Sequence, residues 1–164
     1  MKFLSFSYND NELYGVKVKR EESAWNLIKV LEDFDNTDKI PATLREAIEV
    51  YGVSFIEKIR KVLKLVEESG KAESYKVPFD KIIWRSPITR TPKNILCVGH
   101  NYEAHVNELG DELAKTPKDV LIFTKATTAL AGNNEVVPSH KDITDSLDYG
   151  PTTADFSNDF PRKN

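Results

Sequence analysis

The strongest structural signal in this chain of 164 residues is an amphipathic helical pattern over residues 54–69. Four apolar residues recur every three or four positions and fall on one stripe: Ile56, Ile59, Leu63 and Val66. Gly70 follows, as is typical of the end of a helix. The pattern is too short for a coiled coil, so we expect the helix to pack its stripe against a small sheet.

The N-terminal residues predict such a sheet. Residues 2–8 alternate loosely and are rich in Phe and Tyr, and residues 12–19 alternate again after an Asn-Asp-Asn turn signal. Tyr14, Val16 and Val18 would share one face of the second strand. We therefore expect a β-hairpin.

Two further helices are expected between the hairpin and residue 54. Ser23 is a suitable N-cap for a helix whose apolar residues recur at helical spacing: Trp25, Ile28 and Leu31. Thr43 begins another helix, which Gly52 closes. Residues 1–70 thus predict a small α+β domain without a chemical motif, whose role is packing or assembly.

The following residues predict a connector and then a second domain. Prolines surround the apolar residues 82–84, so we expect 71–91 to be an extended connector with one edge strand. Short apolar runs then indicate the start of a β-rich domain: 95–98, 120–123 and 136–137, with a turn at 130–135. Only three or four strands fit before residue 150, so we expect an incomplete domain over residues 92–149 and an overall α+β class.

Composition and charge exclude several classes of partner. The 23 basic and 26 acidic residues form no basic block, so nucleic acid is not an expected partner. The longest apolar runs have four or five residues, far short of the roughly 20 that span a bilayer, so no membrane is expected either. The single cysteine, Cys97, excludes an internal disulfide and is interpreted as a small buried hydrophobe. With no secretory signal pattern at the N-terminus, we expect a cytoplasmic protein.

Residues 92–108 hold the main candidate site. An apolar run ends at Gly99, which permits a sharp turn, and His105 and Glu108 would share one face of a following helix. A carboxylate beside an imidazole can orient it and favour its protonated form, which suits proton transfer to and from water. By spacing alone, such a pair is more often a solvated helix face, and the residues themselves leave both interpretations open.

Residues 92–149 also resemble the opening of the catalytic domain in the fumarylacetoacetate hydrolase family. The similarity runs through residues 92–108, 120–125 and 136–138, reaches Ser-Leu-Asp-Tyr at 146–149, and is weak before residue 92. It implies a small N-terminal domain, a β-rich catalytic domain and, commonly, a homodimer. The implied chemistry is metal-dependent hydrolysis or decarboxylation of small 2-oxo, diketo or dicarboxylic acids, such as acylpyruvates or oxaloacetate, or isomerisation in aromatic catabolism.

The resemblance also implies roles for particular residues. His105 and Glu108 would activate water from a short lid helix, and Lys125 would face the carboxylate and oxo oxygens of the substrate. From the pattern alone, a lysine at the exposed end of a strand is the favoured interpretation of Lys125. His100 stands where the family often has an arginine or lysine that contacts the substrate anion, and Asn101 better suits a helix cap. Because histidine is only partly charged near neutral pH, this departure points to a weaker contact or a different acid.

The metal site of the family is missing from this sequence. The resemblance implies Mg²⁺ or Mn²⁺ held by a Glu-x-Glu pair soon after the Asp-Tyr, but Gly-Pro-Thr-Thr follows Tyr149. One polar loop contains a histidine and three aspartates at a spacing that fits no compact ligand set: His140, Asp142, Asp145 and Asp148. We therefore assign no metal ligand and expect neither ion to bind this chain well.

The similarity stops abruptly at residue 149. Residues 150–164 show no strand or helix periodicity and predict a disordered tail. This break is typical of a reading-frame shift, so we expect a truncated, inactive and poorly stable product. The alternative is a non-catalytic binding or assembly module that partners a longer relative.

Overall fold

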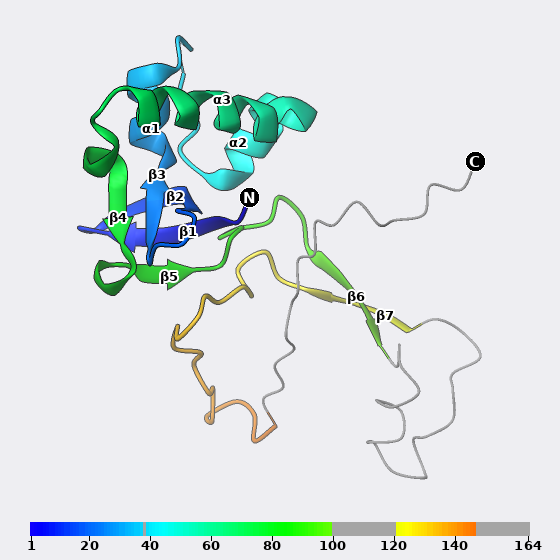
Figure 1. Ribbon diagram of the computed structural model, residues 1–164. Helices are drawn as coiled ribbons and strands as arrows, with labels where there is room; N and C mark the ends of the chain where they lie inside the picture. Colours follow the sequence, from blue (N-terminus) through cyan, green and yellow to red (C-terminus); the bar gives the residue numbers. More distant parts are fainter. Residues whose placement is uncertain (38, 100–120, 147–164) are drawn as a thin grey trace.

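The structure is a computed structural model that describes residues 1–37, 39–99 and 121–146. Its strands are β1 Phe3–Tyr8, β2 Asn11–Lys17, β3 Ser23–Asn26, β4 Lys76–Pro78, β5 Ile83–Arg85, β6 Ile95–Gly99 and β7 Leu121–Lys125. Its helices are α1 Leu27–Phe34, α2 Leu44–Tyr51 and α3 Phe55–Glu68, with short 3₁₀ segments η1 Gly52–Ser54, η2 Ala72–Tyr75 and η3 Phe79–Lys81. A five-stranded antiparallel sheet has the order β4-β3-β2-β1-β5, and β6 pairs with β7 in a separate two-stranded sheet (Figure 1). The fold is therefore mixed, with antiparallel sheets and few helices.

The predicted hairpin is confirmed. β1 and β2 pair from Phe3 opposite Val16 to Tyr8 opposite Asn11. The two residues between the strands, Asn9 and Asp10, both have positive φ, at 49° and 59°. This geometry matches a turn that favours Asn and Asp and follows the natural twist of the strands.

One expected helix begins later than the sequence suggested. Ser23 does not cap a helix but opens β3, which pairs with β2 on one side and β4 on the other. Asn26 caps α1 instead, its side chain accepting a hydrogen bond from the Lys29 amide at 3.3 Å. Pairing to two neighbouring strands thus overrides the helical spacing of apolar residues that begins at Trp25.

The other two helices are confirmed. The Thr43 hydroxyl accepts a hydrogen bond from the Glu46 amide at 3.2 Å, and the Glu46 carboxylate accepts one from the Ala42 amide at 3.0 Å. This reciprocal cap fixes the start of α2. In α3, three of the four stripe residues are buried (Ile59, Leu63 and Val66), whereas Ile56 is 46% exposed.

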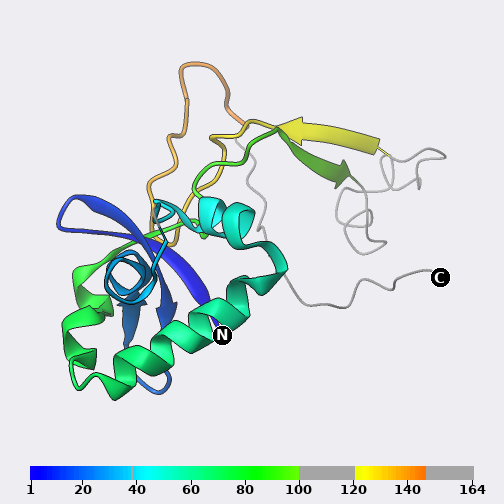
Figure 2. The same ribbon diagram turned by 90° about the horizontal axis from the view of Figure 1, so that it is seen from above.

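The helices lie on one face of the five-stranded sheet (Figures 1 and 2). The main core forms between them, where Tyr14, Val16, Val18 and Trp25 from the sheet meet the buried side chains of the helices. On the opposite face a smaller cluster contains four buried residues, with Phe79 and Trp84 packed against it: Leu4, Phe6, Ala24 and Val77. This region therefore has apolar packing on both sides of its sheet.

The segment expected to be a connector belongs to this sheet. β4 pairs with β3 at one edge, and β5 pairs with β1 at the other, so the edge strand predicted near residues 82–84 is confirmed. The rest of the expectation for 71–91 is wrong, because β4 and β5 complete the sheet rather than leave it. Pro78 is tolerated because it ends an edge strand, where a missing amide breaks few hydrogen bonds.

Beyond β5 the structure describes less regular secondary structure than the sequence predicted. β6 and β7 form where apolar runs were expected, but Val136 and Val137 lie in no strand of the described region and are 88% and 52% exposed. The expected turn at 130–135 is present, with Asn134 at φ 61° and the Glu135 amide donating to the Gly132 carbonyl at 3.2 Å. The predicted tail at 150–164 lies outside the described residues. No helix in the described parts of the chain combines the length and apolar character needed to cross a membrane.

Candidate functional site

Most of the residues predicted to carry chemistry lie outside the described part of the chain. These are His100, Asn101, His105, Glu108 and Asp148. Lys125 is described: it is the last residue of β7, is half-buried and lies opposite Ile95. The geometry around Lys125 is therefore the one part of the predicted site that the structure addresses.

Lys125 and Gly99 lie at opposite ends of the β6–β7 ribbon. Gly99 pairs with Leu121. Lys125 is four residues further along β7, about 13 Å away.

The two faces of the ribbon carry different residues. Side chains alternate along a strand, and residues opposite each other in the register share a face. The face that carries Lys125 holds Ile95, Cys97, Leu121 and Phe123, and we call it the Lys125 face. The other face, which we call the Leu96 face, carries exposed Thr124 and three exposed aliphatic side chains: Leu96 at 74%, Val98 at 50% and Ile122 at 61%.

The Lys125 face is the more covered of the two. Ile95, Cys97 and Lys125 are half-buried, while Leu121 and Phe123 are 50% and 44% exposed. Cys97 was expected to be a small buried hydrophobe, but it is a half-buried free thiol. Its pairing opposite Phe123 places it on an incompletely covered sheet face.

An ion pair joins the segment after β7 to the five-stranded sheet. The Arg85 guanidinium donates to the Glu135 carboxylate at 2.7 Å and to the Ser7 hydroxyl at 2.9 Å. The other oxygen of Glu135 accepts the Gly132 amide at 2.6 Å. A Cβ at position 132 would lie 2.6 Å from the Trp84 carbonyl oxygen, so only glycine fits this approach to β5.

The sequence did not predict the ion pair between Arg85 and Glu135. Arg85 and Glu135 are 50 residues apart, and neither belongs to a recognisable motif. Gly132 in a predicted turn was the only local signal near this contact. A glycine in a turn does not indicate which other segment of the backbone lies against it.

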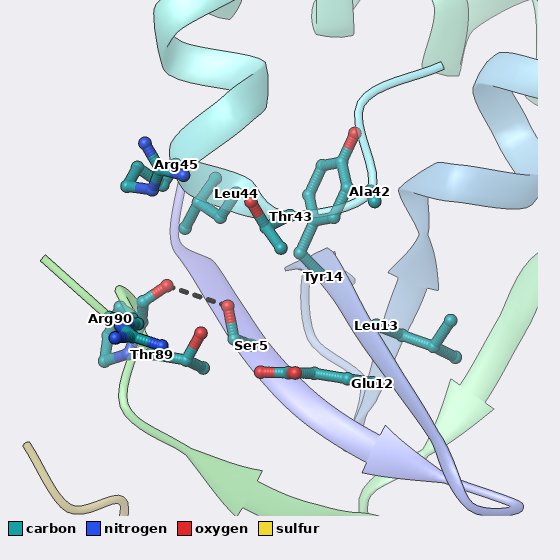
Figure 3. Close-up of a pocket in the computed structure, with 11 residues that line it drawn as sticks. Ser5, Glu12, Leu13, Tyr14, Ala42, Thr43, Leu44, Arg45, Thr89 and Arg90 are labelled. Atoms are coloured by element: carbon teal, nitrogen blue, oxygen red, sulfur yellow. Dashed lines mark hydrogen bonds between the residues drawn. The ribbon is translucent and has the colours of Figure 1, made fainter. Parts of the chain in front are cut away.

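A cavity of about 260 Å³ lies between the hairpin, the start of α2 and the segment after β5 (Figure 3). Its charged lining residues are Glu12, Arg45 and Arg90, and the Arg45 guanidinium bonds Glu49 at 2.6 Å. The Ser5 hydroxyl donates to the Pro87 carbonyl at 2.7 Å, which holds the segment after β5 against β1. The sequence did not indicate this cavity, because three separate segments build it.

Tyr14 forms part of the cavity wall and is fully buried. Its hydroxyl has no hydrogen-bond partner in the described parts of the chain, and Figure 3 shows it directed toward the loop that contains Ala42. Burial raises the pKa of the Tyr14 hydroxyl well above its ordinary value, and the nearby Tyr51, Glu46 and Asp35 add to this effect. Tyr14 is therefore a neutral core residue rather than a source of protons.

The described residues contain no group of three or more His, Cys, Asp or Glu side chains that could hold a metal ion. His140, Asp142 and Asp145 are exposed. The described side chains therefore do not form a binding site for a divalent cation.

No family model matches the chain. It is 47% identical over 150 residues to uncharacterized proteins from Staphylococcus aureus strains USA300, NCTC 8325 and COL. The match covers 91% of this chain and 48% of each relative, so the chain spans about half the length of the curated relatives it matches. These relatives carry no functional name that could be compared with the site.

Proposed function

We propose that residues 92–149 correspond to the first part of a catalytic domain similar to the fumarylacetoacetate hydrolase family. In a complete protein this domain would hydrolyse or decarboxylate small 2-oxo, diketo or dicarboxylic acids. The chain of 164 residues on its own would be inactive, because the carboxylates expected after Tyr149 are replaced.

The observation that carries the proposal is the sequence from Ile95 to Lys125. An apolar strand ends in Gly99, a His and a Glu follow at the family spacing, and Lys125 ends the partner strand. The placement of Lys125 supports its proposed role, since it lies half-buried on the more covered face of an apolar ribbon. A cation in such surroundings favours an anionic partner, which a 2-oxo acid would supply.

The proposed roles belong to side chains of this chain. Lys125 would neutralise the substrate carboxylate, and His105 oriented by Glu108 would take a proton from water or relay one. His100 would contact the substrate anion, most strongly when protonated. We assign no step to a metal ion held by this chain, because the residues described do not form a metal site.

The test is a chimera that joins residues 1–149 to the part of a S. aureus relative outside the match. Turnover of acylpyruvates and oxaloacetate would be measured with Mg²⁺ or Mn²⁺ present. We expect turnover by the chimera and none by the chain of 164 residues. His105→Ala should lower kcat by at least about 100-fold, the usual scale of general acid–base catalysis.

His140→Asn is the matched control. His140 is exposed and has φ 46°, a conformation that asparagine tolerates, and we give it no role. Its turnover should equal that of the parent chimera. A folded chimera that acts on neither substrate class, or a His105→Ala variant with unchanged kcat, would contradict the proposal.

The five-stranded sheet supports a second candidate function, that of a non-catalytic binding or assembly module. Both faces of the sheet are packed with apolar side chains. The main core includes residues of α1, α2 and α3, and neither cluster contains a residue of β6 or β7. This candidate predicts a sharp, cooperative melt of the chain without metal, measured by circular dichroism. A broad, concentration-dependent melt would instead support the unstable truncated product.

A further inference from the structure

The β6–β7 ribbon exposes large apolar side chains on both faces. Leu96, Val98 and Ile122 on one face are at least half exposed, and Leu121 and Phe123 on the other are 50% and 44% exposed. Strands with one solvated face normally alternate apolar and polar residues, whereas strands covered on both sides are nearly continuously apolar. The ribbon has the composition of strands covered on both sides, yet apolar side chains are exposed on both of its faces.

Its edges are also unpaired in the described part of the chain. β6 pairs there only with β7, and β7 only with β6. An isolated two-stranded ribbon is at best marginally stable in water, and open edges readily accept further strands. Among the described residues, nothing pairs with either outer edge of the ribbon, and neither face is fully covered.

We propose that this ribbon is a docking surface for the polypeptide that the S. aureus relatives carry outside the matched region. About half of each relative lies there, which is enough chain to add strands at both edges and an apolar layer on each face. A second copy of this chain fits less well, because a two-fold contact covers the same single face of each ribbon. The inference does not depend on the enzymatic proposal, since it rests on exposed side chains and on the length of the relatives.

The experiment co-expresses the full chain, carrying an affinity tag, with the unmatched region of a S. aureus relative as a separate polypeptide. We expect the two to co-purify in a 1:1 ratio. Hydrogen exchange of the amides in 95–99 and 121–125 should be slower in the complex than in the chain alone. Turnover is not needed for either measurement, so a stable complex without activity would contradict the proposed function but not this inference.

Two double variants locate the surface. Leu96→Thr with Ile122→Thr places polar groups on the Leu96 face while keeping residues that favour strands. It should weaken binding at least tenfold, because burying even one aliphatic side chain contributes about a factor of ten or more to the affinity. Val50→Thr with Val53→Thr changes two other exposed apolar residues, outside the ribbon, and should leave binding unchanged.

Several results would overturn the inference. One is the absence of a complex when both polypeptides are present and the circular dichroism of the chain shows its sheet folded. Another is equal weakening by the two double variants. Slow exchange of the ribbon amides in the chain alone would show that a second copy, or the chain itself, covers the ribbon.

Discussion

The five-stranded sheet and the β6–β7 ribbon are both antiparallel, yet they bury their apolar residues very differently. In the sheet, Tyr14 and Phe6 point to opposite faces and each is fully buried. In the ribbon, Leu96 and Ile122 are 74% and 61% exposed. The comparison shows that strand pairing alone does not produce a core; helices or further strands must supply the second layer.

The largest expected effect separates the two regions by their response to the same substitution. Ile59→Ala removes a fully buried side chain between α3 and the sheet and should lower the free energy of unfolding by about 2–5 kcal/mol. Ile122→Ala, in the exposed ribbon, should change it by less than about 0.5 kcal/mol. Urea unfolding followed by circular dichroism measures both, and a large effect of Ile122→Ala would mean that the ribbon is buried in the chain in solution.

A second prediction concerns the contact that joins the two regions. Gly132→Ala places a Cβ against the backbone of Trp84 and Arg85, and such overpacking costs about 1–3 kcal/mol. We expect the segment around Gly132 to move away from β5 while the sheet stays folded. Amide hydrogen exchange should therefore become faster at residues 132–135, while the amides of β1 and β2 stay protected. Ala129→Gly in the same segment is the control. Unchanged exchange in Gly132→Ala would show that Gly132 does not approach β5 in solution.

The third prediction uses acid to test the helical side of the sheet. Burial alone would raise the pKa of Asp35, but hydrogen bonds from Lys58, Thr37 and Tyr51 outweigh it and hold this pKa below its ordinary value. A lowered pKa in the folded state means that the stabilisation is full above the unfolded value, near 4, and is lost as the pH falls through the folded value.

Asp35→Asn should therefore be less stable than the parent at pH 7, by roughly 1–2 kcal/mol, and the difference should shrink below about pH 4. Thermal unfolding from pH 2 to pH 7 measures it. Asp10→Asn, on the exposed hairpin turn, should show no such convergence. If the difference in stability between Asp35→Asn and the parent were the same from pH 2 to pH 7, the ionised Asp35 carboxylate would not be the source of the stabilisation.

Local signals predicted the elements of the sheet region well, and long-range contacts account for what they missed. The hairpin turn, the cap at Thr43 and the stripe of α3 each depend on residues within a few positions of one another. β3 was expected to be the start of a helix because its strand character depends on β4, about 50 residues later. The roles of β5 and Gly132 depend on partners at comparable distance along the chain.

The candidate site was predicted from a motif, and the structure adds only the position of Lys125. The apolar runs at 95–98 and 120–123 correctly indicated two strands, β6 and β7, because apolar runs and a glycine are local signals. No local signal indicated their mutual register, which places Lys125 at the end away from Gly99. The functional roles of His105 and Glu108 stay predictions, since both lie outside the described residues.

The smallest expected effect has the opposite sign to the others and tests the interior of the sheet region. Tyr14 is fully buried and its hydroxyl has no partner in the described residues, so the fold leaves a polar group desolvated without compensation. Tyr14→Phe removes only this oxygen and should leave the free energy of unfolding unchanged or raise it by up to about 1 kcal/mol. Tyr75→Phe is the matched control, because the Tyr75 hydroxyl donates to the Asp33 carboxylate at 2.7 Å and the loss of this bond should destabilise the chain. Urea unfolding of both variants decides the point: if Tyr14→Phe loses as much as Tyr75→Phe, the Tyr14 hydroxyl has a hydrogen-bond partner in solution, such as a water molecule in the adjoining cavity.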